Sequence, residues 1–222
     1  MKMIIPRVDY VFECGGEKCC SIVIENQRLM YDFMMDLSAQ LQGNEGISVL
    51  SENDKVISIA KKAELLTQFA PFDMNQKNLL TKITARLQEV AMDVDHYLST
   101  NQMVADWERY LMELAVELPG NFEYSKISAE AIIKAAGLKI DESYDSLGEQ
   151  LLDYMELVQE YETGKLFIYI NLRSYMSDAE MNLFLQEILA REINVLFIEG
   201  SEHSLLNVEN RYIIDAECCL IC

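Results

Sequence analysis

Carboxylates gather around a predicted helix end in the middle of the chain. Glu113 and Glu117 lie four residues apart on one helix face, Glu123 follows a Pro-Gly-Asn turn, and Glu130 opens the next helix. Like charges at this spacing repel each other by about a few tenths of a kcal/mol. Ca²⁺ would reverse the sign, because it takes several oxygen ligands from such groups. The pattern is not that of an EF-hand, and a solvated helix face is the simpler interpretation of the same residues.

Phosphate-binding and hydrolytic motifs are missing. The stretch 15–19 (GGEKC) comes nearest to a phosphate loop but lacks the Gly-Lys-Ser/Thr core, and no GxGxxG, HExxH or GxSxG occurs. His96 and His203 are the only histidines. The sequence therefore favours a protein without catalysis. One alternative stays open, an enzyme with an atypical nucleotide site near Asn171 and Glu199, where open α/β sheets bind ligands.

The six cysteines form two groups near the ends of the chain, namely Cys14, Cys19, Cys20, Cys218, Cys219 and Cys222. The CxxC spacing of the last two would suit zinc if both ends converge. However, the last five residues, CCLIC, read as an apolar strand, and free Cys behaves as a small buried hydrophobe. Buried thiols are therefore the favoured interpretation.

The charge of the chain argues against polyanion binding. The formal net charge is −19, and the few basic residues fall into three loose groups, namely Lys61-Lys62, Lys77-Lys82-Arg86 and Lys126-Lys134-Lys139. A protein this acidic repels DNA at long range, since affinity for DNA comes largely from Lys and Arg. Only symmetric assembly would gather so few cations into a basic surface. Carboxylates that collect divalent cations would cancel part of the repulsion.

The first part of the chain, which must position these residues, combines strands with one helix. The pattern predicts strands over 3–12 and 20–25, a helix over 26–42, and a hairpin within 47–60. The start, MKMIIPRVDY, has too short an apolar run for a signal peptide, and no stretch of about 20 apolar residues occurs. A cytoplasmic protein without membrane contact is expected.

The middle of the chain is almost entirely helical. Apolar stripes at spacings of three and four residues predict helices over 79–94, 107–118, 127–136 and 147–161. Such stripes are packing surfaces, because an amphipathic helix must bury one face. Several long helices without strands indicate an arm or bundle that packs on a second subunit.

The last part returns to α/β structure. Residues 165–171 form a continuous apolar run, typical of a strand covered on both faces. Ser177 and Glu180 make a capping box that opens a helix, and residues 194–199 give a second buried strand. Strand, helix and strand over about 35 residues predict a right-handed βαβ unit with parallel strands.

The fold class is therefore α/β, with a discontinuous body at 1–74 and 164–222 and a helical insertion at 75–163. Asp73 or Asn75 is expected to cap the first long helix. Counted from its second residue, the insertion carries seven Lys and Arg against seventeen Asp and Glu, a net charge of −10. The insertion is thus expected to be the more densely acidic region.

Several segments occur in a fixed order: 72–75 (FDMN) leading into LLTKITARLQ, then IIKAAGLKI, KLFIYINLRSYMSDAEMNLFLQEIL, NVLFIEG and 212–215 (YIID). In order, spacing and body–arm–body layout they resemble the Csn2 family, the accessory adaptation proteins of type II-A CRISPR systems. The resemblance covers most of residues 65–222 and is weak before them. It identifies the chain as a divergent member of the family.

The resemblance implies a degenerate ATPase-like α/β head with an inserted α-helical leg domain. It further implies a Ca²⁺-binding homotetrameric ring without catalysis, which encircles double-stranded DNA and threads onto free ends. Such a ring works with the integrase and the effector nuclease of the locus during spacer acquisition. The missing phosphate loop agrees with a head that kept the fold and lost the nucleotide site.

The resemblance also assigns residues. It implies Ca²⁺ ligands at Glu117, Asn121, Glu123 and Glu130. It matches Lys134 to a lysine of the short leg helix, and the further basic residues that would contact DNA are Lys82, Arg86 and Lys126. The Pro-Gly pair before Asn121 and the cysteine-rich ends depart from the family pattern. A second alternative also stays open, a protein scaffold of the adaptation complex that does not bind DNA, which the acidic charge favours.

Overall fold

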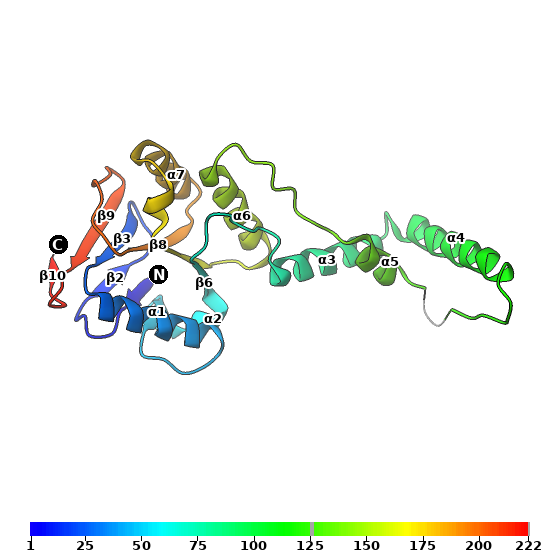
Figure 1. The fold of residues 1–222 in the computed structure, drawn as a ribbon, viewed down its shortest axis with the longest axis horizontal. Helices are drawn as coiled ribbons and strands as arrows, with labels where there is room; N and C mark the ends of the chain where they lie inside the picture. Colours follow the sequence, from blue (N-terminus) through cyan, green and yellow to red (C-terminus); the bar gives the residue numbers. More distant parts are fainter. Residues whose placement is uncertain (125–126, 222) are drawn as a thin grey trace. The chain divides into compact units, whose positions relative to one another are not determined.

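The computed structural model describes residues 1–124 and 127–221, which divide into two units (Figure 1). Unit 1 comprises Met1–Asp73 and Ser143–Cys222, and unit 2 comprises Met74–Glu142. The sequence predicted a discontinuous body with a helical insertion, but it placed the second boundary at 163/164 instead of 142/143. The difference is one helix, α6 (Leu147–Tyr161), whose apolar stripe is buried within unit 1.

The core of unit 1 is a six-stranded sheet with the order β10-β9-β3-β8-β7-β6. Its strands β3, β6, β7, β8 and β9 are parallel and only β10 is antiparallel. The bounds are Cys19–Ile24 for β3, Ala63–Leu66 for β6, Leu166–Ile170 for β7, Asn194–Glu199 for β8, Glu209–Ile214 for β9 and Leu220–Ile221 for β10. The predicted parallel βαβ unit is confirmed, with β7, α7 (Asp178–Ala190) and β8 as its parts.

A second, antiparallel sheet has the order β2-β1-β4-β5. Its strands are β1 (Lys2–Ile4), β2 (Val11–Glu13), β4 (Val49–Glu52) and β5 (Lys55–Ile57). The predicted hairpin is β4–β5, and the two residues of its turn, Asn53 and Asp54, have φ of 51° and 59°. Such left-handed backbone suits Asn and Asp and matches the twist of a tight hairpin. The expected strand over 3–12 is two strands joined by a turn.

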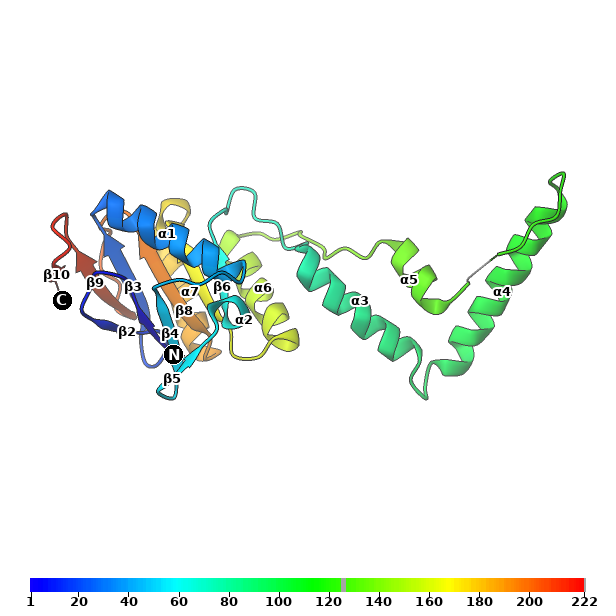
Figure 2. The same ribbon diagram turned by 90° about the horizontal axis from the view of Figure 1, so that it is seen from below.

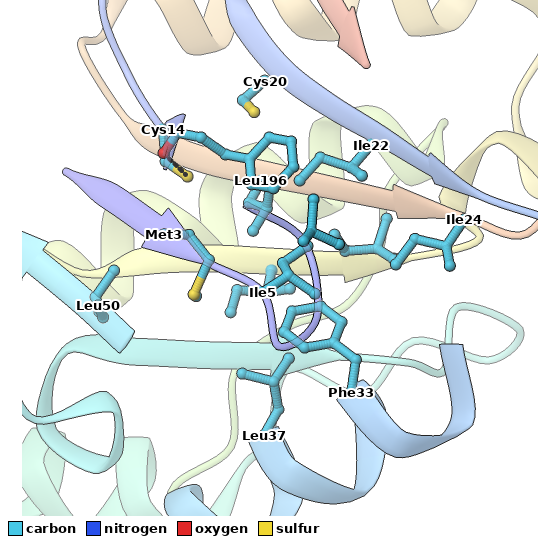
Figure 3. Packing of buried hydrophobic residues seen from close by; sticks show 14 of the residues in the cluster. Met3, Ile5, Cys14, Cys20, Ile22, Ile24, Phe33, Leu37, Leu50 and Leu196 are labelled. Atoms are coloured by element: carbon cyan, nitrogen blue, oxygen red, sulfur yellow. Dashed lines mark hydrogen bonds between the residues drawn. The ribbon is translucent and has the colours of Figure 1, made fainter. Parts of the chain in front are cut away.

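One face of the large sheet is covered by the small sheet and by α1 (Gln27–Leu41). Alternate residues of β3, Cys20, Ile22 and Ile24, belong to the same buried cluster as Phe33 and Leu37 of α1 (Figure 3). All five of these side chains are at most 1% exposed. The period-two alternation of a central strand thus fixes which face receives α1.

The other face is covered by α6 and α7 (Figures 1 and 2). Tyr169 of β7 stacks on Phe197 of β8 with ring centroids 5.3 Å apart, and Phe184 of α7 meets both rings edge-on. The predicted capping box is confirmed, since Ser177 and Glu180 exchange both bonds at the start of α7. Two short helical segments complete the unit, α2 (Ile59–Lys62) and the 3₁₀ turn η1 (Leu172–Tyr175).

Of the described cysteines, all are free thiols. Cys14, Cys19 and Cys20 are buried in the core, Cys218 is half-buried and Cys219 is exposed, while Cys222 lies outside the described residues. Burial raises the pKa of the Cys19 thiol to about 12. The described part of the chain contains no group of three or more His, Cys, Asp or Glu side chains that could hold a metal ion.

Unit 2 consists of α3 (Lys77–Ala91), α4 (Tyr97–Val116) and α5 (Ala129–Ala136). Helix α5 packs mainly on α3 and more lightly on α4. The expected cap of α3 by Asp73 or Asn75 is not found, because the helix begins after Gln76, which makes no capping bond with its side chain. Among the helices of the described residues, none has the length and hydropathy required to cross a membrane.

Candidate nucleic-acid interface

A groove runs between α3 and α5 in unit 2. Its polar lining comes from the residue Asn75 before α3, from one face of α3 and from one residue of α5, the last two sets being Lys77, Thr81, Thr84, Gln88 and Lys134. The α3 members recur at spacings of three and four residues, so they form one stripe. Ammonium, hydroxyl and amide groups are the side chains that proteins use to contact phosphate oxygens.

Lys134, the basic residue that α5 contributes to the groove, forms an exposed ion pair. The Nζ atom of Lys134 lies 2.7 Å from Oε1 of Glu130, one turn away on α5, and the Lys134 side chain is 62% exposed. An exposed ion pair of this kind contributes about 0–1 kcal/mol. A phosphate group therefore competes with Glu130 for Lys134 at little cost.

The charges of unit 2 are separated along its sequence. Residues 74–88 and 127–140, which contain the groove, carry five Lys and Arg against one Glu. Residues 89–124, which contain α4, carry one Arg against eight Asp and Glu. Unit 2 as a whole has a net charge of −4 and unit 1 has −15, so the expectation that the insertion is the more acidic region is wrong. The six acidic residues at 143–163 belong to unit 1.

The predicted DNA contacts do not share one surface. At 100° per residue, Lys82 and Arg86 lie about 140–180° around α3 from Lys77, and thus on the side away from the groove. Arg86 is also paired with Glu89 at 2.8 Å. Lys134 lines the groove, and Lys126 lies outside the described residues. Lys77, which the sequence analysis grouped with Lys82 and Arg86, faces Lys134 instead; the signal for it was the polar stripe that Lys77 shares with Thr81, Thr84 and Gln88.

The apolar stripe predicted on α4 is not buried within the chain. Of the predicted residues, Trp107, Leu114 and Leu118 are 44–55% exposed and Leu111 is half-buried, and the neighbouring Tyr110 is 51% exposed. A shallow groove along α4 is lined by Met103, Trp107 and Tyr110 together with polar neighbours. Contiguous exposed apolar surface of this kind marks an interaction site.

The four expected Ca²⁺ ligands are not brought together in a single chain. Glu117 ends α4, and the following segment turns back so that the Tyr124 hydroxyl donates to the Leu111 carbonyl. Glu130 instead lines a groove with Asn101 and Val104, in the N-terminal half of α4. Thirteen residues of helix, about 20 Å, separate Val104 from Glu117. The four residues thus do not fit one calcium site within the described chain.

The alternative site near Asn171 and Glu199 is occupied by internal hydrogen bonds. Asn171 adopts φ of 56°, and its Oδ1 accepts from the Gly200 amide at 2.8 Å. Oε1 of Glu199 accepts from the Arg173 amide at 3.1 Å, so this carboxylate caps η1. Burial raises the pKa of Glu199 to about 7, against the lowering effect of the Arg173 amide.

A buried ionic network, which the sequence did not predict, surrounds this carboxylate. The Arg173 guanidinium, with its side chain 3% exposed, donates to Asp178 at 2.6 Å, to the Ser204 carbonyl at 3.1 Å and to Glu209 at 3.5 Å. His203 Nε2 lies 3.7 Å from Glu199 Oε2. The network ties the β8–β9 loop to η1 and α7. Arg173 Nε and His203 Nε2 are buried without a hydrogen-bond partner among the described residues, while the remaining bonds of the guanidinium hold the loop in place.

Comparisons with known proteins agree with this architecture. The sequence model of the family described as CRISPR-associated protein (Cas_Csn2) matches residues 40–218. A CRISPR-associated protein Csn2 of Enterococcus faecalis is 23% identical over 210 residues, 90% of this chain and 89% of that protein. One of Streptococcus agalactiae is 22% identical over 199 residues, 86% of each chain.

The fold is similar to the crystal structure of Stu0660 of Streptococcus thermophilus, with a TM-score of 0.58 and 14% identity, over 97% of this chain and 74% of that chain. At this identity the likeness concerns the fold alone. Because the family model spans most of the chain, and both curated relatives are matched over nearly their full length, the chain belongs to the Csn2 family of CRISPR-associated proteins, as a divergent member.

Proposed function

We propose that this protein is a non-catalytic, double-stranded DNA-binding protein that acts at DNA ends in CRISPR spacer acquisition. The observation that carries the proposal is the groove of unit 2 that places Lys77 and Lys134 together, within two segments that carry five Lys and Arg against one Glu in a chain with a net charge of −19. The groove presents Lys77, Lys134 and hydroxyl and amide groups, a set suited to phosphate. The integrase and effector nuclease of the locus are the proposed protein partners.

Binding by one chain would be weak, because each phosphate contact releases only about one counterion and the rest of the protein repels DNA. The proposed solution is a homotetrameric ring. In this ring the exposed α4 face, centred on Trp107, packs against a second copy of the chain. An apolar stripe at helical spacing suits such self-association. Closed symmetry would turn four grooves toward one duplex.

Ca²⁺ is proposed as a counter-charge for the α4 stretch and not as the occupant of a cage within one chain. Eight Asp and Glu against one Arg in residues 89–124 supply the oxygen ligands that Ca²⁺ prefers. Because Glu130 of α5 lies beside Val104, about 20 Å along α4 from Glu117, a site that contains both must take ligands from two copies.

The proposed absence of catalysis is supported by the connection from β3 to α1. This connection consists of Glu25 and Asn26 only, and Asn26 caps α1 by accepting from the Leu29 amide. A phosphate loop needs a longer glycine-rich turn between strand and helix. We interpret unit 1 as an ATPase-like head in which that turn has been lost. The scaffold alternative, without DNA binding, retains the acidity of unit 1 as its support.

The test compares linear duplex with sealed circular duplex of the same sequence, each with Ca²⁺ and with chelator, alongside mass measurement by light scattering. The proposal predicts binding to linear DNA by a tetramer, weaker binding after chelation, and little binding to circles. Equal affinity for circles and linear DNA would refute end threading. Absence of binding to both would favour the scaffold, and ATP turnover lost on Asn171→Ala or Glu199→Gln would favour the enzyme.

A further inference from the structure

The amide of Asn75 pairs with the main chain of a residue 65 positions away. Its Oδ1 accepts from the Ile140 amide at 2.8 Å, and its Nδ2 donates to the Ile140 carbonyl at 3.3 Å. Beside this pair, the Met74 amide donates to Oε1 of Glu142 at 2.6 Å. One side chain thus reproduces the two-bond exchange that joins opposed residues in an antiparallel sheet.

The pair connects the two segments on which the basic groove depends. Asn75 lies two residues before Lys77, and Ile140 lies six residues after Lys134, beyond the left-handed C-cap Gly137 of α5. Asn75 itself lines the same groove as the two lysines. Its hydrogen bonds therefore join the chain leaving α5 to the chain entering α3.

Helix α5 depends on tertiary contacts for its stability and position. It has eight residues and none of them is buried. A helix this short is marginal in water unless tertiary contacts hold it. The packing of α5 on α3 supplies part of that hold. The Asn75 pair supplies a directional part, because its two bonds fix both the distance and the register of the segment that follows α5.

We propose that Asn75 is a positioning residue for DNA binding, which holds Lys134 at its place across the groove from Lys77. The inference rests on the proposed function of this groove. Asn75 does not act as a helix cap in this proposal, because the N-cap position of α3 is Gln76. It also requires no contact between Asn75 and DNA, because both polar atoms of the amide are engaged with Ile140.

The experiment uses the full chain with Asn75→Ala, Lys134→Ala and the double variant. The matched control is Asn78→Ala, because Asn78 is an exposed asparagine on the same helix. Affinity for a short linear duplex is measured by fluorescence anisotropy at fixed salt. Asn75→Ala is expected to weaken binding about 3- to 10-fold, as for loss of one or two net hydrogen bonds, and Asn78→Ala to leave it unchanged. In the Lys134→Ala background, Asn75→Ala is expected to cause little further loss.

Hydrogen exchange by mass spectrometry supplies the second readout. In Asn75→Ala, a peptide spanning 137–142 is expected to exchange faster, while β3 and β8 peptides of unit 1 keep their protection and show that the chain is folded. A full additional loss in the Lys134→Ala background, or unchanged exchange at 137–142, would overturn the inference. If wild-type protein binds no DNA, the proposed function fails, and the exchange readout alone still decides whether Asn75 holds this segment.

Discussion

Two parts of unit 2, the α3–α5 pair and α4, are both helical but differ in the charge and the polarity of their exposed side chains. The stretch with α3 and α5 carries five basic residues against one acidic residue, while the stretch with α4 carries one against eight. The α3–α5 groove carries Lys77 and Lys134 among hydroxyl and amide groups, whereas α4 exposes Trp107, Tyr110 and Leu114. One part thus suits a polyanion, and the other suits an apolar partner surrounded by carboxylates.

The difference teaches that net charge is a poor guide when charges are segregated. A value of −19 for the chain argues against DNA binding, yet most of it belongs to unit 1 and to the α4 stretch. The electrostatic field at a groove depends on the charges within about a Debye length, roughly 8–10 Å at physiological salt. The relevant quantity is therefore the local sum at the α3–α5 groove.

The largest expected effect comes from the apolar part, α4. Trp107→Glu should weaken self-association by at least about 100-fold, because aromatic residues at the centre of an interface commonly contribute about 2–4 kcal/mol. Light scattering over a concentration series measures it. Arg109→Glu is the control, since residue 109 lies about 200° around α4 from Trp107. A Trp107→Glu protein with wild-type mass at every concentration would remove α4 as the assembly surface.

The basic part, the α3–α5 pair, is tested by reversing its charges. Lys77→Glu with Lys134→Glu should lower DNA affinity about 100-fold near 0.1 M salt, because two phosphate contacts become repulsive. Lys18→Glu with Lys55→Glu changes the net charge equally at exposed positions of unit 1. Anisotropy titrations at several salt concentrations compare the two. Equal losses in both would mean that only total charge matters.

Any pH dependence of DNA binding must be separated from the stability of unit 1. The pKa of Glu199 is raised to about 7 by burial, so the folded state binds a proton that the unfolded state releases above its lower pKa. This contribution to the free energy of unfolding is full below about pH 4.5 and is lost as pH rises through about 7, by about 3 kcal/mol in total.

Denaturant unfolding at pH 5 and pH 8 should therefore show lower stability at pH 8 for the wild type. Glu199→Gln should flatten this difference, and Glu45→Gln, at an exposed position of the same unit, should leave it intact. A wild type that gains stability between these pH values would contradict the burial of a protonated Glu199.

The smallest effect is expected on the far side of α3. Lys82→Ala with Arg86→Ala should weaken DNA binding only about 2-fold, because these side chains face away from the groove and act through screened long-range attraction. The comparison is Lys77→Ala with Lys134→Ala, measured in the same titration. If the two pairs lose equal affinity, DNA covers α3 on both sides, and the groove is not the site.

Elements with strong local signals could be predicted from the sequence. The β7–α7–β8 unit was found because its strands are continuous apolar runs and its helix opens with Ser177 and Glu180. Strand β6 and helix α2 were missed, because four residues carry too little periodicity for either pattern. The boundary at 142/143 was missed because the stripe of α6 has the same period as those of α3 and α4.

The contacts of the candidate site could not be predicted from local sequence patterns. Lys134 was assigned correctly to the short helix that now lines the groove, but its separation from Lys82 and Arg86 depends on the rotation of α3 against α5. The Asn75 pair joins positions 65 residues apart, and the Arg173 network joins four elements. Neither leaves a signature in neighbouring residues, because both arise only when distant segments meet.

Hydrogen exchange of the wild-type protein, with and without a linear duplex, shows whether DNA binds at the α3–α5 groove. New protection is expected in peptides from residues 75–88 and 127–140, and none in unit 1 peptides from β3 and β8. Protection confined to unit 1, or no change at saturating DNA, would contradict binding at this groove.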